Sequence, residues 1–155
     1  MPKEEGRGSK TKMNKKGVTL LELIVVFVII AIGAVLAVPN LRPWILNYRL
    51  RSATRDIASN LRAAQMRAVS NNLNYQVFFD TGAGTYKLQR NSGGLWLDEG
   101  TAQILPTGIS IGTNFGSTLI FSHNSSSNGG SIQLSNTKNT RQITVLPSTG
   151  RITIQ

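Results

Sequence analysis

Apolar residues recur along this chain in three successive patterns, and each pattern predicts a different element. From residue 18 to residue 38 the chain is apolar over 21 positions, with Glu22 as the only charged residue. A helix of that length spans roughly 30 Å, the thickness of a bilayer core. The next stretch, 39–70, repeats apolar residues every three or four positions, which predicts an amphipathic continuation of the helix. Pro39 and Pro43 predict a kink or a locally melted turn between the two halves. The apolar stripe of the second half consists of Leu46, Leu50, Ala53, Ile57, Leu61, Ala64 and Ala68.

The third pattern, over residues 71–155, consists of short apolar or alternating segments separated by turns rich in Gly, Asn, Ser and Pro. Short strands with such turns are typical of antiparallel sheets. The predicted fold class is therefore α+β, with a long N-terminal helix packed on a C-terminal head of two antiparallel sheets. The apolar stripe of the helix is the expected cover for one sheet. The predicted strands are Tyr75–Phe79, Thr85–Arg90, Leu95–Leu97, Ile109–Ile111, Leu119–Ser122, Ser131–Leu134, Arg141–Leu146 and Arg151–Gln155.

Charge is distributed unevenly between the start of the chain and the rest of it. Residues 1–17 hold six Lys/Arg and two Glu, a net +4, and the remainder has a net +6 within the total of +10. The basic residues before the apolar helix place that end in the cytoplasm by the positive-inside rule, so the head lies outside the inner membrane. The sequence contains no cysteine, which excludes disulfides and thiolate metal sites.

The junction between the basic segment and the apolar helix reads Lys15-Lys16-Gly17-Val18-Thr19-Leu20-Leu21-Glu22. It resembles the signature of the type IV pilin and pseudopilin family. The resemblance implies that residues 1–17 are a leader, which a prepilin peptidase cleaves between Gly17 and Val18. It further implies methylation of the new amino group of Val18, where the family usually has phenylalanine. Glu22 would then neutralise the amino terminus of a neighbouring subunit during filament assembly.

Later segments are similar to one branch of that family, the H-type minor pseudopilins and related minor pilins. This resemblance implies a minor structural subunit of a type II secretion filament, which serves protein secretion, or of a type IV pilus. Its implied partners are other pilins in a hetero-oligomeric filament or tip, the prepilin peptidase, an inner-membrane assembly platform, and membrane lipid before assembly. The chain would be a single-pass bacterial inner-membrane protein with a periplasmic head, and later part of the pilus or pseudopilus. The matching segments are Val38–Leu41, Trp44, Arg49–Ala53, Asp56–Leu61, Tyr75–Asp80 and Pro147–Ile152.

No group of residues in the sequence has the composition of a catalytic or cofactor site. His123 is the only histidine and follows a predicted strand, so it has no second imidazole or thiol with which to hold a metal. Asp98 and Glu99 are adjacent, and on a strand adjacent side chains point to opposite faces. We therefore predict a protein that is not an enzyme and uses no cofactor or metal.

Two other functions remain open. Related minor pilins bind DNA through a C-terminal Gly-Arg motif, which Gly150-Arg151 resembles, although Thr153 stands where a second arginine is expected. Lys138 and Arg141 would add positive charge at the same end, whereas an arginine at a strand edge can also serve only to keep a sheet soluble. The other alternative is a single-pass membrane protein that keeps its first 17 residues and binds a periplasmic partner without polymerising.

Overall fold

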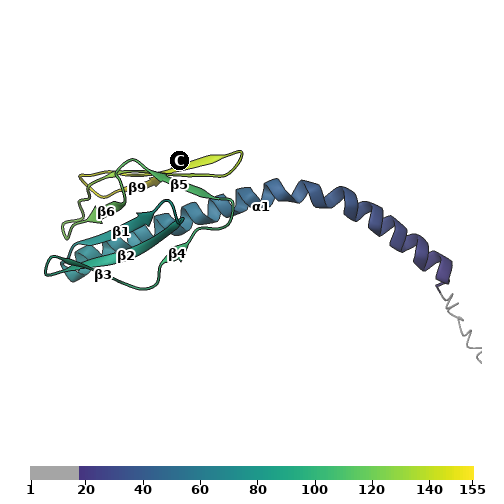
Figure 1. Cartoon of the computed structure of the whole chain (residues 1–155), viewed down its shortest axis with the longest axis horizontal. Helices are drawn as coiled ribbons and strands as arrows, with labels where there is room; N and C mark the ends of the chain where they lie inside the picture. The colour runs from purple at the N-terminus through teal and green to yellow at the C-terminus, as the bar shows by residue number, and fades with distance from the viewer. Residues whose placement is uncertain (1–17) are drawn as a thin grey trace, which may run out of the picture. The chain divides into compact units, whose positions relative to one another are not determined.

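The computed structural model describes residues 18–155, except for the side chains of residues 36–41. The predicted leader, with Gly17, lies outside the described residues. The chain divides between Asn40 and Leu41 into two units, and the helix α1, Leu20–Asn71, runs through both of them (Figure 1). Pro39 and Pro43 do not interrupt the helix, so the predicted melted turn is wrong. A proline inside a helix lacks a backbone donor and crowds the carbonyl four residues earlier, so the alternative outcome, a kink, stays a prediction.

The end of α1 is set by a left-handed residue that follows it directly. Asn72 has φ 53°, and the amide of Leu73 donates to the carbonyl of Ala68 at 3.2 Å. Asparagine tolerates this conformation, and the hydrogen bond satisfies one of the free carbonyls at the end of the helix. The chain then turns back along the helix into the first strand of the head (Figure 1).

The head contains two antiparallel sheets, as the sequence predicts. One sheet has the order β3-β2-β1-β6, with β4 also paired to β2, and the other has the order β5-β7-β8-β9. Every strand predicted from the sequence is present, with ends that differ by at most two residues. The prediction lacks the strand β4, because two residues are too few to show an alternating pattern. The strands are β1 Tyr75–Asp80, β2 Thr85–Ser92, β3 Leu95–Asp98, β4 Gln103–Ile104, β5 Ser110–Thr113, β6 Thr118–Phe121, β7 Gly130–Ser135, β8 Thr140–Val145 and β9 Ile152–Ile154.

Two hairpins in the first sheet are closed by local hydrogen bonds and backbone geometry. Between β1 and β2, the Asp80 carboxylate accepts from the amides of Gly82 and Ala83 at 3.1 and 2.9 Å. Between β2 and β3, only Gly93 and Gly94 form the turn, with φ values of 62° and 88°. A two-residue turn with both φ values positive matches the twist of the flanking strands and requires glycine or asparagine.

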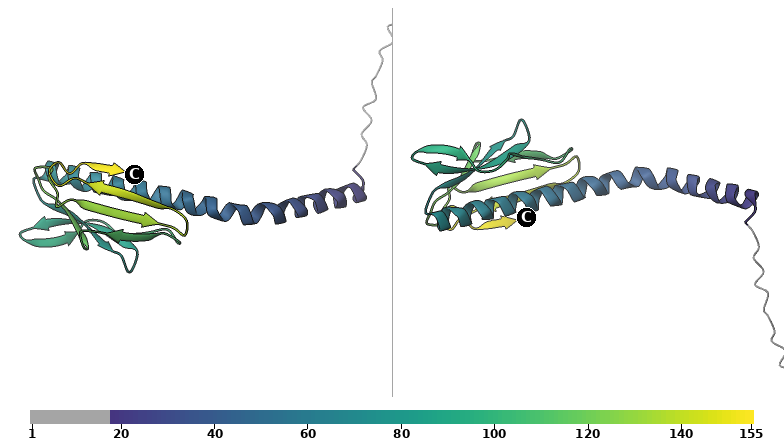
Figure 2. Two further views of the ribbon diagram at one scale, coloured as in Figure 1. Left: turned by 90° about the horizontal axis from the view of Figure 1, so that it is seen from above. Right: turned by 90° about the horizontal axis from the view of Figure 1, so that it is seen from below.

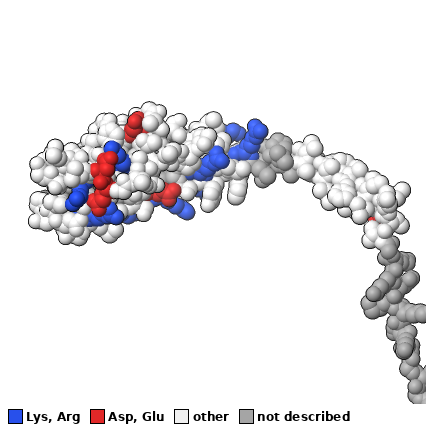
Figure 3. Space-filling model, turned by 60° about the horizontal axis from the view of Figure 1, so that its bottom comes forward, with Lys and Arg blue, Asp and Glu red and all other residues white. Residues whose placement is uncertain are grey.

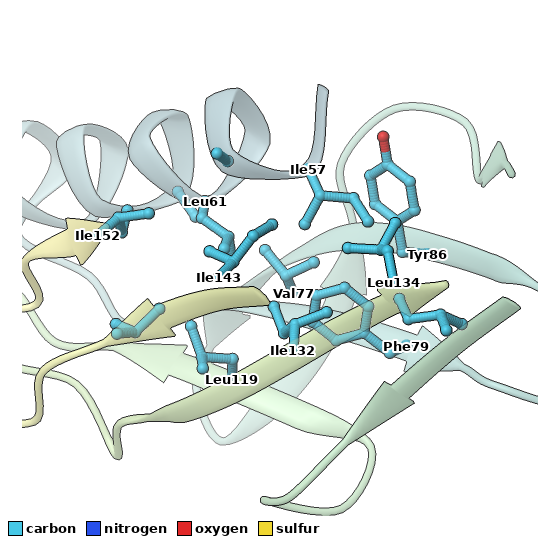
Figure 4. Close-up of a cluster of buried hydrophobic side chains, with 14 of the residues drawn as sticks. Ile57, Leu61, Val77, Phe79, Tyr86, Leu119, Ile132, Leu134, Ile143 and Ile152 are labelled. Carbon is cyan, nitrogen blue, oxygen red and sulfur yellow. The ribbon is translucent and has the colours of Figure 1, made fainter. Parts of the chain in front are cut away.

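The core of the head lies between α1 and the inner faces of both sheets (Figure 4). Six of the seven residues of the predicted stripe, from Leu50 to Ala68, are at most 2% exposed, and Leu46 is half-buried. In Figure 4, Ile57 and Leu61 point from the helix toward Val77 of one sheet and Ile143 of the other. The stripe therefore covers both sheets, whereas the sequence predicts a cover for one.

Candidate functional site

The first turn of α1 contains the residues that the sequence assigns to processing and assembly. Val18 is 71% exposed, and Thr19 precedes the helix as its N-cap. The Thr19 hydroxyl accepts a hydrogen bond from the amide of Glu22 at 3.2 Å. Glu22 is exposed in the first turn, where a negative charge interacts favourably with the helix dipole. Thr19 and Glu22 have the spacing of a capping box, a signal that was readable in the sequence but is missing from the prediction above.

The helix surface that follows Thr19 is exposed on all sides. Each residue from Val18 to Val35 is exposed, and Glu22 is the only charged one among them. Several large apolar side chains are more than half exposed, among them Phe27 at 62% and Ile29 at 63%. An apolar surface of this extent on a helix marks an interaction site.

Within the residues whose side chains are described, no helical segment is both long and apolar enough to cross a membrane. The predicted membrane segment, 18–38, includes residues 36–38, whose side chains lie outside the described part of the chain. The assignment of that segment to the membrane stays a prediction.

The basic residues of the second half of α1 are on its solvent side. Arg51, Arg55 and Arg62 lie outside the apolar stripe of the helix and are all exposed. Arg49, by contrast, donates to the carbonyl of Thr107 at 3.0 Å and so helps to hold the segment before β5 on the helix. On the face of the head in Figure 3, acidic groups lie next to basic ones, and basic groups without acidic neighbours follow the helix toward the segment drawn in grey.

The three candidate DNA-binding residues do not gather at one end of the head. In the antiparallel pair of β8 and β9, Gln142 exchanges hydrogen bonds with Gln155, and the amide of Leu146 donates to the carbonyl of Arg151. Arg141 and exposed Lys138 therefore lie at one end of this pair and Arg151 at the other. Five residues of strand separate the two ends, roughly 16 Å. The prediction that these charges share one end is wrong, because the register was not available from the sequence.

Arg141 instead faces the helix. A hollow of about 320 Å³ between α1 and the end of β8 is lined by Asn47, Arg51 and Arg141, among others. An adjoining hollow of about 390 Å³ is lined by Arg51, Arg55 and Arg141, together with Thr54 and Ile154. Sequence analysis places Arg51 and Arg55 on the helix and Arg141 on a distant strand, and it does not bring them together.

Asp98 and Glu99 are adjacent in the chain but bind different partners. The Asp98 carboxylate accepts from Gln89 at 2.6 Å and lies 3.0 Å from the ammonium group of Lys87. The hydrogen bond from Gln89 and the contact with Lys87 lower the pKa of Asp98 below its usual 3.8. Glu99 forms an ion pair with Arg67 of α1 at 2.9 Å. These contacts brace the sheet and attach the β3–β4 connection to the helix.

Other titratable groups of the head have surroundings that are explained by packing. Burial raises the pKa of Tyr86 above 10.0, and the nearby Asp56 carboxylate adds to the shift. His123 is exposed in the turn after β6. Among the described residues, no group of three or more His, Cys, Asp or Glu side chains is arranged to hold a metal ion.

Comparison with known proteins connects these features to a family. Residues 12–38 match the family described as the prokaryotic N-terminal methylation motif, and residues 53–149 match the type II transport protein GspH. No curated protein sequence matches the chain. The first match covers the exposed apolar part of the helix and the basic segment before it. The second match covers later turns of α1 and most of the head.

The fold is similar to that of solved minor pilins and pseudopilins. The type IV minor pilin FimU of Pseudomonas aeruginosa superimposes with a TM-score of 0.61 at 14% identity, covering 70% of this chain and 90% of FimU. The minor pseudopilin EpsH from the type 2 secretion system of Vibrio cholerae gives a TM-score of 0.59 at 11% identity, covering 67% of this chain and 93% of EpsH. The GspH match alone covers more than half of this chain, and the chain therefore belongs to the GspH family of minor pseudopilins and pilins.

Proposed function

We propose that this chain is a minor subunit of a type II secretion pseudopilus or a type IV pilus, and that α1 packs among the helices of other subunits. The observation that carries the proposal is the exposed apolar surface from Val18 to Val35, which is interrupted by a single carboxylate. A surface of this kind has to be covered by lipid or by other apolar helices. A structural family of this type is typically non-enzymatic, which agrees with a mechanical role.

Processing is the first step of the proposed mechanism. A prepilin peptidase cleaves between Gly17 and Val18, and the new amino group of Val18 is methylated. The positive terminus then lies one turn from Glu22 of its own chain and within reach of Glu22 in a neighbour. An isolated carboxylate among apolar helices is costly, and pairing with an amino terminus offsets that cost. The pairing would also fix the register between adjacent helices.

Intact-mass measurement of the chain purified from membranes tests the processing step. A mature protein that begins at Val18, with or without one added methyl group, is the expected result. A chain that retains Met1 would contradict the proposal and would favour the single-pass protein that binds its partner without polymerising.

The assembly role of Glu22 needs a test that separates charge from helix capping. Glu22→Gln keeps the length of the side chain and its ability to complete a capping box, but it removes the charge. We expect this variant to be depleted from sheared filaments as strongly as Glu22→Ala. Thr19→Ala is the matched control, because it removes the cap, at about 1 kcal/mol, and leaves the charge. Normal incorporation of Glu22→Gln together with loss of Thr19→Ala would show that Glu22 acts only as a cap.

DNA binding through Arg151, Arg141 and Lys138 remains the alternative function. The head gives it limited support, because Arg151 lies at the opposite end of the β8–β9 pair from the other two residues. A gel-shift titration of the full chain in detergent, over a series of salt concentrations, tests it. Binding through several phosphate contacts weakens steeply as salt rises, and no shift at low salt would remove the alternative.

A further inference from the structure

The two adjoining hollows described above, which we call the arginine hollow, lie where α1 runs beside β8 and β9 (Figure 2). Arg51 and Arg141 line both of them, and Arg55 lines the second. Arg51 and Arg55 are exposed and Arg141 is half-buried. Three positive side chains from two distant parts of the sequence therefore converge on one concave surface.

No acidic residue lines the arginine hollow. The described side chains of the chain form two ion pairs, and these use Asp98 and Glu99. Asp56 lines a different hollow, beside Tyr86, and Asp80 caps the turn that follows it. No acidic side chain therefore lies among the three arginines, and an anion bound between them would reduce their mutual repulsion.

The walls of the hollow are held by bonds that do not involve the arginines. The side-chain oxygen of Asn47 accepts hydrogen bonds from the side-chain amides of Asn136 and Asn139, at 3.1 and 2.6 Å, which fixes the β7–β8 turn on α1. The buried Thr54 hydroxyl donates to the carbonyl of Leu50 at 2.7 Å. A fixed frame lowers the entropic cost of binding, and it leaves the guanidinium groups available for a ligand.

We infer that the arginine hollow receives an acidic segment of a neighbouring filament subunit, whose carboxylates pair with Arg51, Arg55 and Arg141. This inference rests on the proposed function and adds the surface and the chemistry of the partner to it. Guanidinium groups bind carboxylates through two parallel hydrogen bonds and are weakly hydrated, which suits them to protein interfaces.

Two observations favour a protein carboxylate over a nucleic acid. The arginines surround a bounded hollow, and they do not continue as a basic track to Arg151. Residues 18–155 also carry eleven Lys/Arg against five Asp/Glu, so close packing against further copies of this chain would bring like charges together. A different subunit with acidic residues would pair with the three arginines of the hollow, and it would also offset the net positive charge of residues 18–155.

Site-specific photo-crosslinking of the full chain, in cells that contain the complete assembly machinery, tests the inference. A photo-reactive amino acid replaces Thr140, which is exposed and lines the hollow. Gln133, exposed on β7 of the same sheet, is the matched control position. We expect position 140 to crosslink to another filament subunit within a segment rich in Asp and Glu, and position 133 to give no such product.

Charge variants then test the role of the arginines. The double change Arg51→Gln with Arg141→Gln should lower the crosslink yield at position 140 by about tenfold, which corresponds to the loss of two partly exposed ion pairs. Arg62→Gln, on an exposed part of α1 outside the hollow, should leave the yield within about twofold of the unsubstituted chain. Circular dichroism of the double variant verifies that its fold is retained.

The inference is overturned if position 140 crosslinks to nucleic acid or to a segment without acidic residues, or if the double variant crosslinks normally. It is also overturned if the chain enters filaments and position 140 gives no product, and in that case the proposed function still stands. If the chain never enters filaments, the proposed function itself is wrong, and sheared filaments distinguish the two failures.

Discussion

Gly150 provides a stringent test of the contacts that attach two loops of the head to α1. It is buried in the turn between β8 and β9 with φ 61°, a left-handed conformation. A β-carbon at this position would overlap the carbonyl oxygen of Ser125 and would lie 2.6 Å from Nε2 of Gln65. The same Nε2 donates to the carbonyls of Ser125 and Thr149, at 3.3 and 3.0 Å. Gly150→Ala should therefore separate α1 from two loops of the head at once.

The expected cost of Gly150→Ala is the sum of a backbone effect and a contact effect. The left-handed conformation costs alanine about 1 kcal/mol, and the loss of two hydrogen bonds costs about 1 kcal/mol each. The smaller conformational freedom of unfolded alanine returns roughly 0.5 kcal/mol. The free energy of unfolding should fall by about 2.5 kcal/mol, which lowers the urea midpoint by about 1 to 2 M.

Urea unfolding of the full chain in detergent, followed by tryptophan fluorescence, measures this change. Trp96 is half-buried on β3 and reports on the head, whereas Trp44 is 66% exposed. Gly84→Ala is the matched control, because Gly84 has φ 63° but no atom within 4 Å of the added carbon. The control should cost less than about 1 kcal/mol. Equal midpoints for the two variants would refute the argument that close contact, and not backbone strain, requires Gly150.

Three further predictions concern the pH dependence, the core and the assembly of the chain. Hydrogen bonding lowers the pKa of Asp98, so the stability contributed by its carboxylate is present above about pH 3.8 and is lost as the pH falls through the folded-state pKa. Asp98→Asn should thus be less stable than the unsubstituted chain at pH 7, and the two stabilities should approach each other at pH 3. A difference in urea midpoint that stays the same at both pH values would be evidence against this. Ile57→Ala, at a fully buried position, should lower the free energy of unfolding by about 2–5 kcal/mol, whereas exposed Val69→Ala should lower it by less than about 1 kcal/mol. Overproduction of the chain with the assembly machinery but without other subunits should yield no long filaments, because its net positive charge opposes self-packing, and electron micrographs with abundant homopolymers would contradict this.

The sequence by itself determined the type and order of nearly all elements in the head. The spacing of three and four between apolar residues predicted the buried stripe from Leu50 to Ala68, and alternation between turn residues located every strand except β4. These are properties of consecutive residues, so they can be read without knowledge of the partner elements. The junction around Gly17 and Glu22 also identified the family, which the matches to the methylation motif and to GspH confirm.

Only the tertiary structure decided which segments lie side by side. It placed β6 beside β1 and left β5 in the other sheet, and it set the register that separates Arg141 from Arg151. It also brought Arg141 to Arg51 and Arg55, some 90 positions earlier in the chain, to form the arginine hollow. Such pairings depend on packing between elements that are distant in sequence, where alternative registers keep the same local pattern. A pattern of consecutive residues therefore predicts each element. The pairing and register of the strands depend instead on which side chains are buried together in the core.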